Sequence, residues 1–309
     1  MMRRRAALGA LLAAAGCARV RPLTAAAPRL DEWTLDAPGI GPLRVSIWRP
    51  DATGADAPPR GVLYMHDGQN LFDPAVSGYG KVWHVDRAAA RLAAAGTIDP
   101  PIIVGVWNPG DARFRTYLPR AAYDRLAPDV RADLGVRIGD GPVRSDAYLA
   151  FMADVLKPAV DRAYRTRPGV ADTRVMGSSM GGLISLYALV ERPDIFGAAG
   201  CLSTHWPMFI PPDDRAAAPH ADAVTAAWTG YLRDRLGKPV GRRIWFDHGT
   251  ATLDRLYAPY QAAVDALLPA LGWRPARDFA SRTYSGAPHE ENAWAARVAD
   301  PLAWLFAVA

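Results

Sequence analysis

Short apolar runs alternate with longer amphipathic segments along most of the chain. The apolar runs, bounded by Gly, Pro, Asp or Asn, predict buried strands, and apolar residues at helical spacing predict helices between them. The predicted strands cover residues 61–66, 101–107, 173–176, 196–202, 243–246 and 279–284. The predicted helices cover residues 83–95, 145–164, 183–191, 257–271 and 291–306. Strands that alternate with helices in this way predict a mostly parallel central sheet covered by helices on both faces.

Three segments depart from this alternation. Period-two alternation in E-W-T-L and L-R-V-S-I-W, joined through P-G-I-G-P, predicts two antiparallel strands at a sheet edge between Leu30 and Trp48. Residues 124–141 are rich in Arg and Asp and predict a loop or excursion near a cleft. Residues 208–239 predict an insertion with helical parts that covers the cleft as a lid. The chain has 309 residues, half of them hydrophobic, so residues 30–309 are expected to form one large α/β domain.

The strongest chemical signal lies between a predicted strand and a predicted helix. Gly177, Ser179 and Gly181 form the pattern G-x-S-x-G, with strand 173–176 before it and helix 183–191 after it. A strand, a sharp turn and a helix hold such a serine at the tip of a strained turn, where the glycines leave room for neighbouring backbone. A glycine-rich helix start without chemistry is the alternative. The strand and helix around the motif favour Ser179 as a catalytic nucleophile.

A serine hydroxyl is a weak nucleophile at neutral pH, so it needs a base, and the base needs an orienting carboxylate. In hydrolases built on this turn, the acid and then the histidine follow the serine along the chain. Of the six histidines, only His289 lies in the loop between the last predicted strand and the closing helix. Asp254, in the loop beyond Gly249, is favoured as the acid. Asp247, still attached to strand 243–246, is the alternative.

Backbone amides are expected to form an oxyanion hole beside the serine. The Met180 amide lies at the predicted helix start, where free N–H groups and the helix dipole favour a developing negative charge. A second amide is expected from Gly68 or Gln69, in the polar turn after strand 61–66. The loops at the carboxyl ends of parallel strands meet at one edge of the sheet, which brings this turn toward the serine.

Substrate contacts are expected at the same edge of the sheet. Arg113 and Tyr117 lie in a polar loop after a buried strand, and both are placed to face substrate. Trp83, Trp107 and Trp206 lie in or beside the loops around the expected cleft, where their rings would stack on a sugar or phenolic ring. Tryptophans in a domain of this size also serve as core residues, which is the alternative for all three.

Residues 1–17 have the features of an export signal. Consecutive arginines precede the apolar run 6–15, and A-A-G-C ends at Cys17. The run is far shorter than the roughly 20 residues that a spanning helix needs. The series predicts a bacterial lipoprotein signal in which Cys17 carries the lipid, with ordinary cleavage or twin-arginine export as alternatives. Residues 18–29 then form a flexible tether, and the mature protein is expected in the periplasm or on the membrane.

Charge and cysteine content narrow the remaining classes. The formal net charge is +5, but the arginines are scattered and form no basic stripe with interleaved aromatic residues. Nucleic acid is therefore not expected as a partner. Cys17 and Cys201 are the two cysteines, and lipidation of Cys17 leaves Cys201 without an intramolecular partner. The fold is expected to depend on its core and not on disulfides.

Five blocks of sequence together resemble one protein family. In chain order they are H-D-G-Q-N-L-F-D, R-F-R-T-Y-L-P, G-S-S-M-G-G, D-H-G-T-A-T-L-D and A-P-H-E-E-N-A-W. They resemble the Putative esterase family, also called the esterase D or enterochelin-esterase-like group, which includes feruloyl, acetyl-sugar and siderophore esterases and the mycolyltransferases. The resemblance implies an α/β-hydrolase fold, a nucleophile at Ser179 and a base at His289, with no metal or other cofactor. Thr116 departs from the family, which often has Glu at that position.

Three functions follow from this resemblance and these residues. The first is hydrolysis of an extracytoplasmic sugar, phenolic or siderophore ester through an acyl-enzyme. The second is acyl transfer of the mycolyltransferase type, in which a sugar or lipid hydroxyl replaces water. The third is a non-catalytic surface binding protein that has kept the fold. The serine, the histidine and both glycines are present, which favours the hydrolase. Some siderophore esterases use a Ser–His pair alone, so an acid at Asp254 is not required by the family.

Overall fold

The computed structural model describes residues 29–50, 58–138, 141–209 and 218–307. Cys17, with the rest of the predicted export signal and nearly all of the predicted tether, lies outside the described residues. The described strands are β1 (Arg29–Ala37), β2 (Gly41–Arg49), β3 (Val62–His66), β4 (Ile102–Val106), β5 (Thr173–Ser178), β6 (Ala198–Leu202), β7 (Arg243–Gly249) and β8 (Phe279–Tyr284). Every predicted strand is therefore present, with bounds that differ by a few residues.

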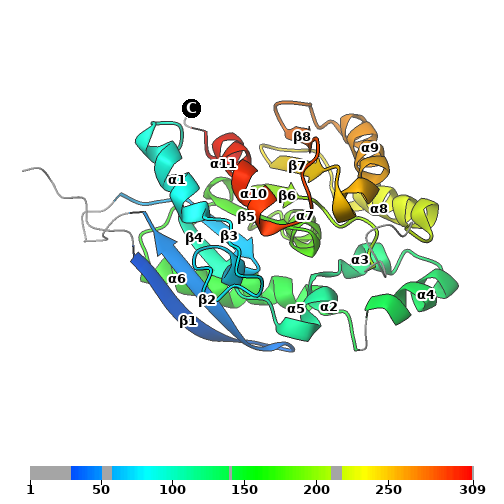
Figure 1. The fold of residues 1–309 in the computed structure, drawn as a ribbon, viewed down its shortest axis with the longest axis horizontal. Coiled ribbons are helices and arrows are strands. Elements are labelled where there is room, and N and C mark those ends of the chain that lie inside the picture. The colour runs from blue at the N-terminus through cyan, green and yellow to red at the C-terminus, as the bar shows by residue number, and fades with distance from the viewer. Residues whose placement is uncertain (1–28, 51–57, 139–140, 210–217, 308–309) are drawn as a thin grey trace, which may run out of the picture.

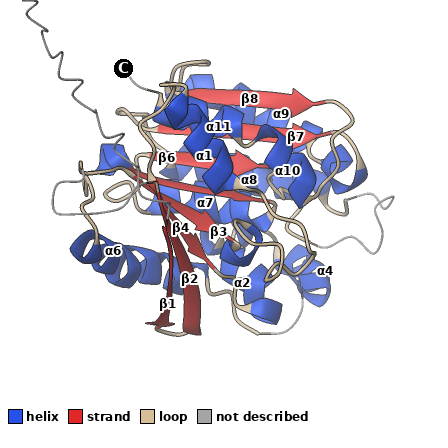
Figure 2. Ribbon diagram, turned by 60° about the vertical axis from the view of Figure 1, so that its left-hand side comes forward, coloured by secondary structure: helices blue, strands red, loops and turns tan. Residues whose placement is uncertain are grey.

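The strands form one twisted eight-stranded sheet in the order β1-β2-β4-β3-β5-β6-β7-β8 (Figure 1). β1 pairs antiparallel with β2, and β2 pairs antiparallel with β4, whereas all the later pairs are parallel. The predicted antiparallel pair at one edge and the predicted mostly parallel sheet are both confirmed. β1 and β8 form the two edges, which lie at opposite ends of the sheet in Figure 2.

Helices cover both faces of the sheet. Those described are α1 (Val85–Ala94), α2 (Arg113–Tyr117), α3 (Arg120–Tyr123), α4 (Pro128–Ile138), α5 (Ser145–Ala150), α6 (Lys157–Ala163), α7 (Met180–Glu191), α8 (Ala221–Arg235), α9 (Ala258–Leu267), α10 (Glu291–Arg297) and α11 (Ala299–Phe306). α1 and α11 lie side by side on one face, and α7 packs on β5 and β6 from the other (Figure 1).

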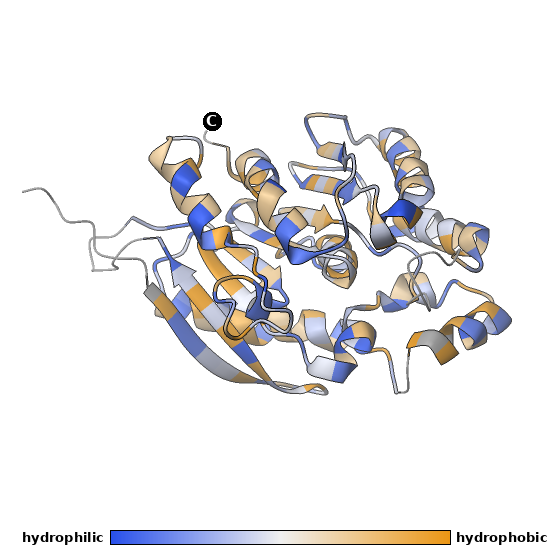
Figure 3. Ribbon diagram, viewed as in Figure 1, coloured by the Kyte–Doolittle hydropathy of each residue, from blue (hydrophilic) through white to orange (hydrophobic). Residues whose placement is uncertain are grey.

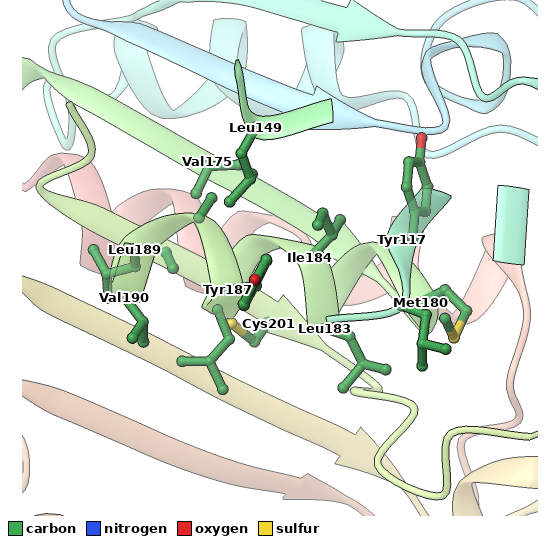
Figure 4. Packing of buried hydrophobic residues seen from close by; sticks show 14 of the residues in the cluster. Tyr117, Leu149, Val175, Met180, Leu183, Ile184, Tyr187, Leu189, Val190 and Cys201 are labelled. Atoms are coloured by element: carbon green, nitrogen blue, oxygen red, sulfur yellow. The ribbon is translucent and has the colours of Figure 1, made fainter. Parts of the chain in front are cut away.

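The central strands supply side chains to two separate cores. On β3, Val62 and Tyr64 point into the larger core, while Leu63 and Met65 point into the smaller core under α1 and α11. Successive side chains of a strand face opposite sides of the sheet, so a strand covered on both faces must be apolar throughout. Figure 3 shows this apolar centre, and Figure 4 shows α7 packed against β5 within the larger core.

Two predicted helices are present in modified form, and one predicted loop is wrong. The predicted helix 145–164 is α5 and α6 joined by a π-helical turn, Phe151–Leu156. The predicted closing helix is divided into α10 and α11 at Val298. Within the predicted loop 124–141, Pro128–Ile138 forms α4, because its apolar residues face the larger core. No helix among the described residues is long and apolar enough to cross a membrane.

The strand order leaves a crevice at the carboxyl ends of the central strands. The chain leaves β3 toward β4 on one side, and β5 lies on the other side of β3. The loops that follow β3 and β5 therefore separate at a switch point, which leaves a crevice at the carboxyl ends of these strands. This arrangement of strands and helices is the predicted α/β-hydrolase fold.

Candidate active site

Ser179 occupies a strained turn between β5 and α7. Its backbone angles are φ 58° and ψ −124°, which an L-residue rarely adopts. Its N–H donates to the Leu202 carbonyl on β6 at 2.9 Å, which holds the turn against the sheet. A Cβ on Gly177 would lie 2.9 Å from the carbonyl group of Gly181. Only glycine fits there, so the sequence motif is explained by the tightness of the turn.

His289 lies in the loop between β8 and α10 and is paired with Asp254. His289 Nδ1 and Asp254 Oδ1 are 2.5 Å apart. The His289 N–H donates to Thr252 Oγ1 at 2.8 Å, which fixes the loop beside the 3-10 turn Thr252–Leu256 that carries Asp254. The carboxylate accepts from Nδ1–H, so Nε2 is the nitrogen left as a base. The structure therefore places Asp254 in the position of an orienting acid.

The Asp254 carboxylate is stabilised as an anion although it is fully buried. Burial alone would raise its pKa, but hydrogen bonding to His289 and the His289 charge outweigh burial and hold the pKa below its ordinary value. Ser203 Oγ donates to Oδ2 at 2.6 Å, and the Gly249 N–H donates to the same oxygen at 2.5 Å. Both oxygens of the carboxylate are thus engaged, which fixes its orientation toward the imidazole.

Asp247, the alternative acid, forms an ion pair with Arg297, whose guanidinium also lies 3.9 Å from Asp254 Oδ2. Asp247 Oδ1 accepts from Arg297 Nε at 3.0 Å, and Asp247 Oδ2 accepts from Trp245 Nε1 at 2.7 Å. Arg297 also donates to Ser203 Oγ at 2.7 Å. Burial raises the pKa of Asp247 despite the Arg297 charge. Asp247 therefore orients Arg297, Arg297 donates to Ser203, and Ser203 donates to Asp254.

Ser179 and His289 open onto one cavity of about 600 Å³. Its wall is formed by the loops after β3, β4, β5 and β8 and by residues 78–83. Gln69 lines it from the 3-10 turn Gly68–Asn70, whereas a Cβ on Gly68 would lie 2.4 Å from the Gly105 carbonyl oxygen. Gly68 therefore packs closely on β4. Met180 is the first residue of α7, so its amide lies at the helix N-terminus as expected.

Charged side chains line the cavity mainly in pairs. Arg113 donates to both carboxylate oxygens of Asp67, at 2.6 and 2.7 Å, and Asn108 Nδ2 donates to Oδ1 at 2.7 Å. Burial opposes ionisation of Asp67, but the Arg113 guanidinium holds the pKa of this carboxyl below its ordinary value. Lys81 forms an ion pair with Glu290, next to His289. Arg113 thus reaches the cavity as expected, in a fixed orientation.

Glu291 is a third carboxylate at the wall, and it connects two loops. Asn70 Nδ2, in the turn after β3, donates to Glu291 Oε1 at 3.3 Å. Burial raises the pKa of Glu291 above its ordinary value. The contact holds the turn that carries the expected oxyanion donors against the loop that carries His289.

The substrate contact predicted for Trp206 needs correction. Trp206 is 1% exposed and packs edge-on against Trp228 of α8, and its Nε1–H donates to Gln261 at 3.2 Å. The chain turns back into the core directly after β6, so the indole does not line the cavity. Tyr117 is likewise fully buried. Trp83 does line the cavity and remains placed to contact substrate.

The described part of residues 208–239 does not form the predicted lid. α8 packs against α7 and α9, and its apolar side chains belong to the larger core. None of its residues lines the cavity. Residues 210–217 lie outside the described residues. α8 is amphipathic because it covers the core, which explains the helical pattern in the sequence.

The corrected position of Trp206 gives a stability prediction. Trp206→Ala should lower the free energy of unfolding by about 3–5 kcal/mol, measured by urea denaturation, because it leaves a large cavity in the core. Trp206→Phe should leave the KM for an ester within about twofold of wild type, since the ring does not touch the cavity. Trp83→Phe, at the cavity wall, is the matched comparison and should raise KM. A raised KM in a folded Trp206→Phe variant would support the original expectation that Trp206 contacts substrate.

Sequence reasoning missed Tyr257, His205 and Ser203. Tyr257 follows Asp254 by three residues in a 3-10 turn, so the two side chains lie on one face. The three-residue spacing could therefore have indicated that Tyr257 lies beside Asp254. The contacts of His205 and Ser203 with this face depend on the pairing of β6 with β7, which no local pattern gives. In the described part of the chain, no group of three or more His, Cys, Asp or Glu side chains is placed to hold a metal ion.

Known proteins similar to this chain were found by sequence and by structure. The family described as Putative esterase matches residues 41–267. A siderophore enterobactin esterase of Emericella nidulans is 26% identical over 184 residues, which is 55% of this chain and 56% of that protein. The ferri-bacillibactin esterase BesA of Bacillus subtilis is 28% identical over 162 residues, or 48% of this chain and 50% of that protein. The chain thus spans about half the length of the curated relatives it matches.

Solved structures match nearly the whole chain at low sequence identity. The enterochelin esterase of Shigella flexneri has a TM-score of 0.61 and 17% identity, covering 89% of this chain and 57% of that chain. The BES protein of Bacillus cereus has a TM-score of 0.62 and 16% identity, covering 90% of this chain and 96% of that chain. At this level of identity the likeness concerns the fold, which agrees with the strand order described above.

Proposed function

The chain belongs to the Putative esterase family, and we propose that it is a serine carboxylic-ester hydrolase that acts through an acyl-enzyme. One observation carries the proposal. Ser179, on its strained turn, and His289 line the same cavity, and Asp254 lies 2.5 Å from His289 Nδ1. A nucleophile, a base and an oriented acid at one cavity are the groups that ester hydrolysis needs.

In the proposed mechanism, Ser179 Oγ attacks the ester carbonyl carbon while His289 Nε2 accepts its proton. The amides of Met180 and of Gln69 or Gly68 stabilise the oxyanion. The bond to the alcohol oxygen then breaks, and His289 returns the proton to the leaving alcohol. Water, deprotonated by His289, attacks the acyl carbon, the bond to Ser179 Oγ breaks, and His289 returns the proton to Oγ as the acid leaves. Asp254 stabilises the imidazolium in both halves of the reaction.

The proposed substrates are sugar, phenolic or siderophore esters outside the cytoplasm. Two features support this class. Trp83 and Trp294 line the cavity and offer aromatic surface, and Arg113 and Lys81 add cations at its wall. Two relatives are named as siderophore esterases, and a third is named as a ferri-bacillibactin esterase. Acyl transfer differs from hydrolysis only in the acceptor of the acyl group. If a sugar or lipid hydroxyl outcompetes water in the second step, the protein is an acyltransferase and not a hydrolase.

Activity-based labelling tests the reaction. A fluorophosphonate probe is expected to modify one residue of the purified protein, Ser179, because only an activated serine reacts at neutral pH. Peptide mass spectrometry identifies the labelled residue. The same protein should be screened against p-nitrophenyl acyl esters, feruloyl esters, acetylated xylan and catecholate siderophores. No turnover of any ester together with no labelling would leave the non-catalytic binding protein as the better hypothesis.

We also propose that the protein is exported and anchored by a lipid on Cys17. The proposal rests on the basic, apolar and A-A-G-C series at the N-terminus. A fatty-acid analogue should tag the full-length protein in a bacterial host, and Cys17→Ser should release the protein from the membrane fraction. Cys201→Ser, which changes a buried cysteine, is the control and should keep the tag. An untagged soluble protein with a different N-terminus would contradict lipidation.

A further inference from the structure

The Tyr257 hydroxyl lies among the catalytic side chains and has no part in the mechanism given so far. Tyr257 is fully buried where the turn Thr252–Leu256 meets α9. Its oxygen lies 2.8 Å from His205 Nδ1 and 3.4 Å from His289 Nδ1. The Ser179 side chain lies near the same hydroxyl, where it offsets part of the rise in the Tyr257 pKa that burial causes. One neutral oxygen thus contacts both the proposed nucleophile and the proposed base.

The protonation of His205 fixes the direction of the Tyr257 proton. His205 Nε2 lies 2.5 Å from the Phe209 carbonyl oxygen, which can only accept, so Nε2 carries a hydrogen. Burial, helped by the charge of His289, lowers the pKa of His205 to about 3, so the ring is neutral at neutral pH. His205 Nδ1 then has no hydrogen and acts as an acceptor. The Tyr257 O–H must therefore donate to His205.

A tyrosine whose single proton points to His205 presents only lone pairs to its other neighbours. The His289 Nδ1–H, which donates to Asp254, has the Tyr257 oxygen as a second, more distant acceptor. The Ser179 side chain likewise faces lone pairs and not the tyrosine proton, so its own proton stays available to His289 Nε2. Positive charge develops on the imidazole as it takes the serine proton, and lone pairs directed at the ring stabilise that charge.

We propose that Tyr257 is a positioning residue for Ser179 and His289, and that His205 acts through it by keeping its proton turned away from them. The inference rests on the proposed esterase function, because Tyr257 serves that reaction. Neither Tyr257 nor His205 lines the cavity within the described part of the chain. Loss of the hydroxyl should therefore change kcat and leave KM in place.

Tyr257→Phe tests the first half of the proposal. We expect kcat to fall about tenfold, with KM within about twofold of wild type. Tyr260→Phe is the matched control, because Tyr260 lies in the first turn of α9, directly after Tyr257, and its buried hydroxyl has no partner among the described residues. It should keep the wild-type kcat. Full kcat in Tyr257→Phe, or an equal loss in Tyr260→Phe, would overturn the positioning role.

Variants of His205 test the second half. His205→Phe leaves the Tyr257 proton without its acceptor, so it turns toward Ser179 and should lower kcat by a similar factor. His205→Asn keeps an acceptor near the Nδ1 position and should recover part of that loss. The double variant Tyr257→Phe/His205→Phe should be no slower than Tyr257→Phe, because His205 acts through the hydroxyl. Losses that multiply in the double variant would show independent effects and refute the coupling.

A measurement on the resting protein separates this inference from the esterase proposal. ¹⁵N NMR of the histidine-labelled wild-type protein should show His205 protonated on Nε2 alone at neutral pH. Tyr257→Phe should shift the resonance of the His289 Nδ1–H. Both results are independent of turnover, so they hold even where no ester is hydrolysed. A proton on His205 Nδ1, or an unchanged His289 signal in a folded Tyr257→Phe variant, would overturn the inference.

Discussion

Ser179→Ala is expected to lower ester turnover by about 10⁴–10⁶-fold while the protein keeps its fold. The change removes the only atom that forms the acyl-enzyme, and the oxyanion amides of the turn remain to give a small residual rate. Ser179 has φ 58°, and this backbone conformation costs alanine about as much as serine, so the substitution should not destabilise the turn. The effect should appear in kcat, measured with a p-nitrophenyl ester, and in complete loss of fluorophosphonate labelling.

Ser185→Ala is the matched control for this experiment. Ser185 lies on α7, the helix that follows Ser179, and its hydroxyl donates to the Gly181 carbonyl at 2.7 Å without reaching the cavity. Its loss should affect stability slightly and turnover little. Undiminished activity in Ser179→Ala, with an unchanged circular dichroism spectrum, would reject Ser179 as the nucleophile and with it the proposed acyl-enzyme on this residue.

Most of the fold follows from the sequence because the central strands are buried on both faces. An apolar run such as 62–66 has no other place in a folded protein, and the Gly and Pro residues around it mark its ends. The sequence does not predict α4, because its apolar residues are separated by charged ones. Val130, Leu134 and Ile138 repeat every four residues and pack in the larger core, but the Arg and Asp residues between them predict a loop. Here the spacing was the better guide than the composition.

The chemistry of the site was predictable where it is local and unpredictable where it depends on packing. The turn at Ser179 and the loop at His289 are each defined by a few neighbouring residues and by chain order. Trp206 has the sequence of a loop beside the cleft, but the chain folds inward after β6, and the indole fills the core. The contact between His205 and Tyr257 joins residues that are 52 positions apart in the chain, so no local pattern contains it.

Asp254 and Asp247 have different partners, so their replacement by asparagine should lower kcat by different amounts. Asp254→Asn is expected to lower kcat by about 10²–10⁴-fold with little change in KM. The amide would turn a donor, or a neutral and weaker acceptor, toward His289 Nδ1, so the tautomer with a free Nε2 base loses its support. Asp254 is held ionised by His289, with Ser203 and the Gly249 amide as further donors, and this charge is what stabilises the imidazolium during attack.

Asp247→Asn should act mainly on stability. Asp247 is 1% exposed and pairs with the buried Arg297 at 3.0 Å, so neutralising it leaves this cation with the more distant Asp254 carboxylate, 3.9 Å away, and should lower the free energy of unfolding by about 3 kcal/mol. Its effect on kcat should be smaller than that of Asp254→Asn, because Asp247 does not contact His289 and is linked to Asp254 through Arg297 and Ser203. Both variants should be compared in kcat and in urea denaturation. The opposite ranking in kcat would transfer the acid role to Asp247, and near-normal turnover in both would indicate a Ser–His pair that works without an acid.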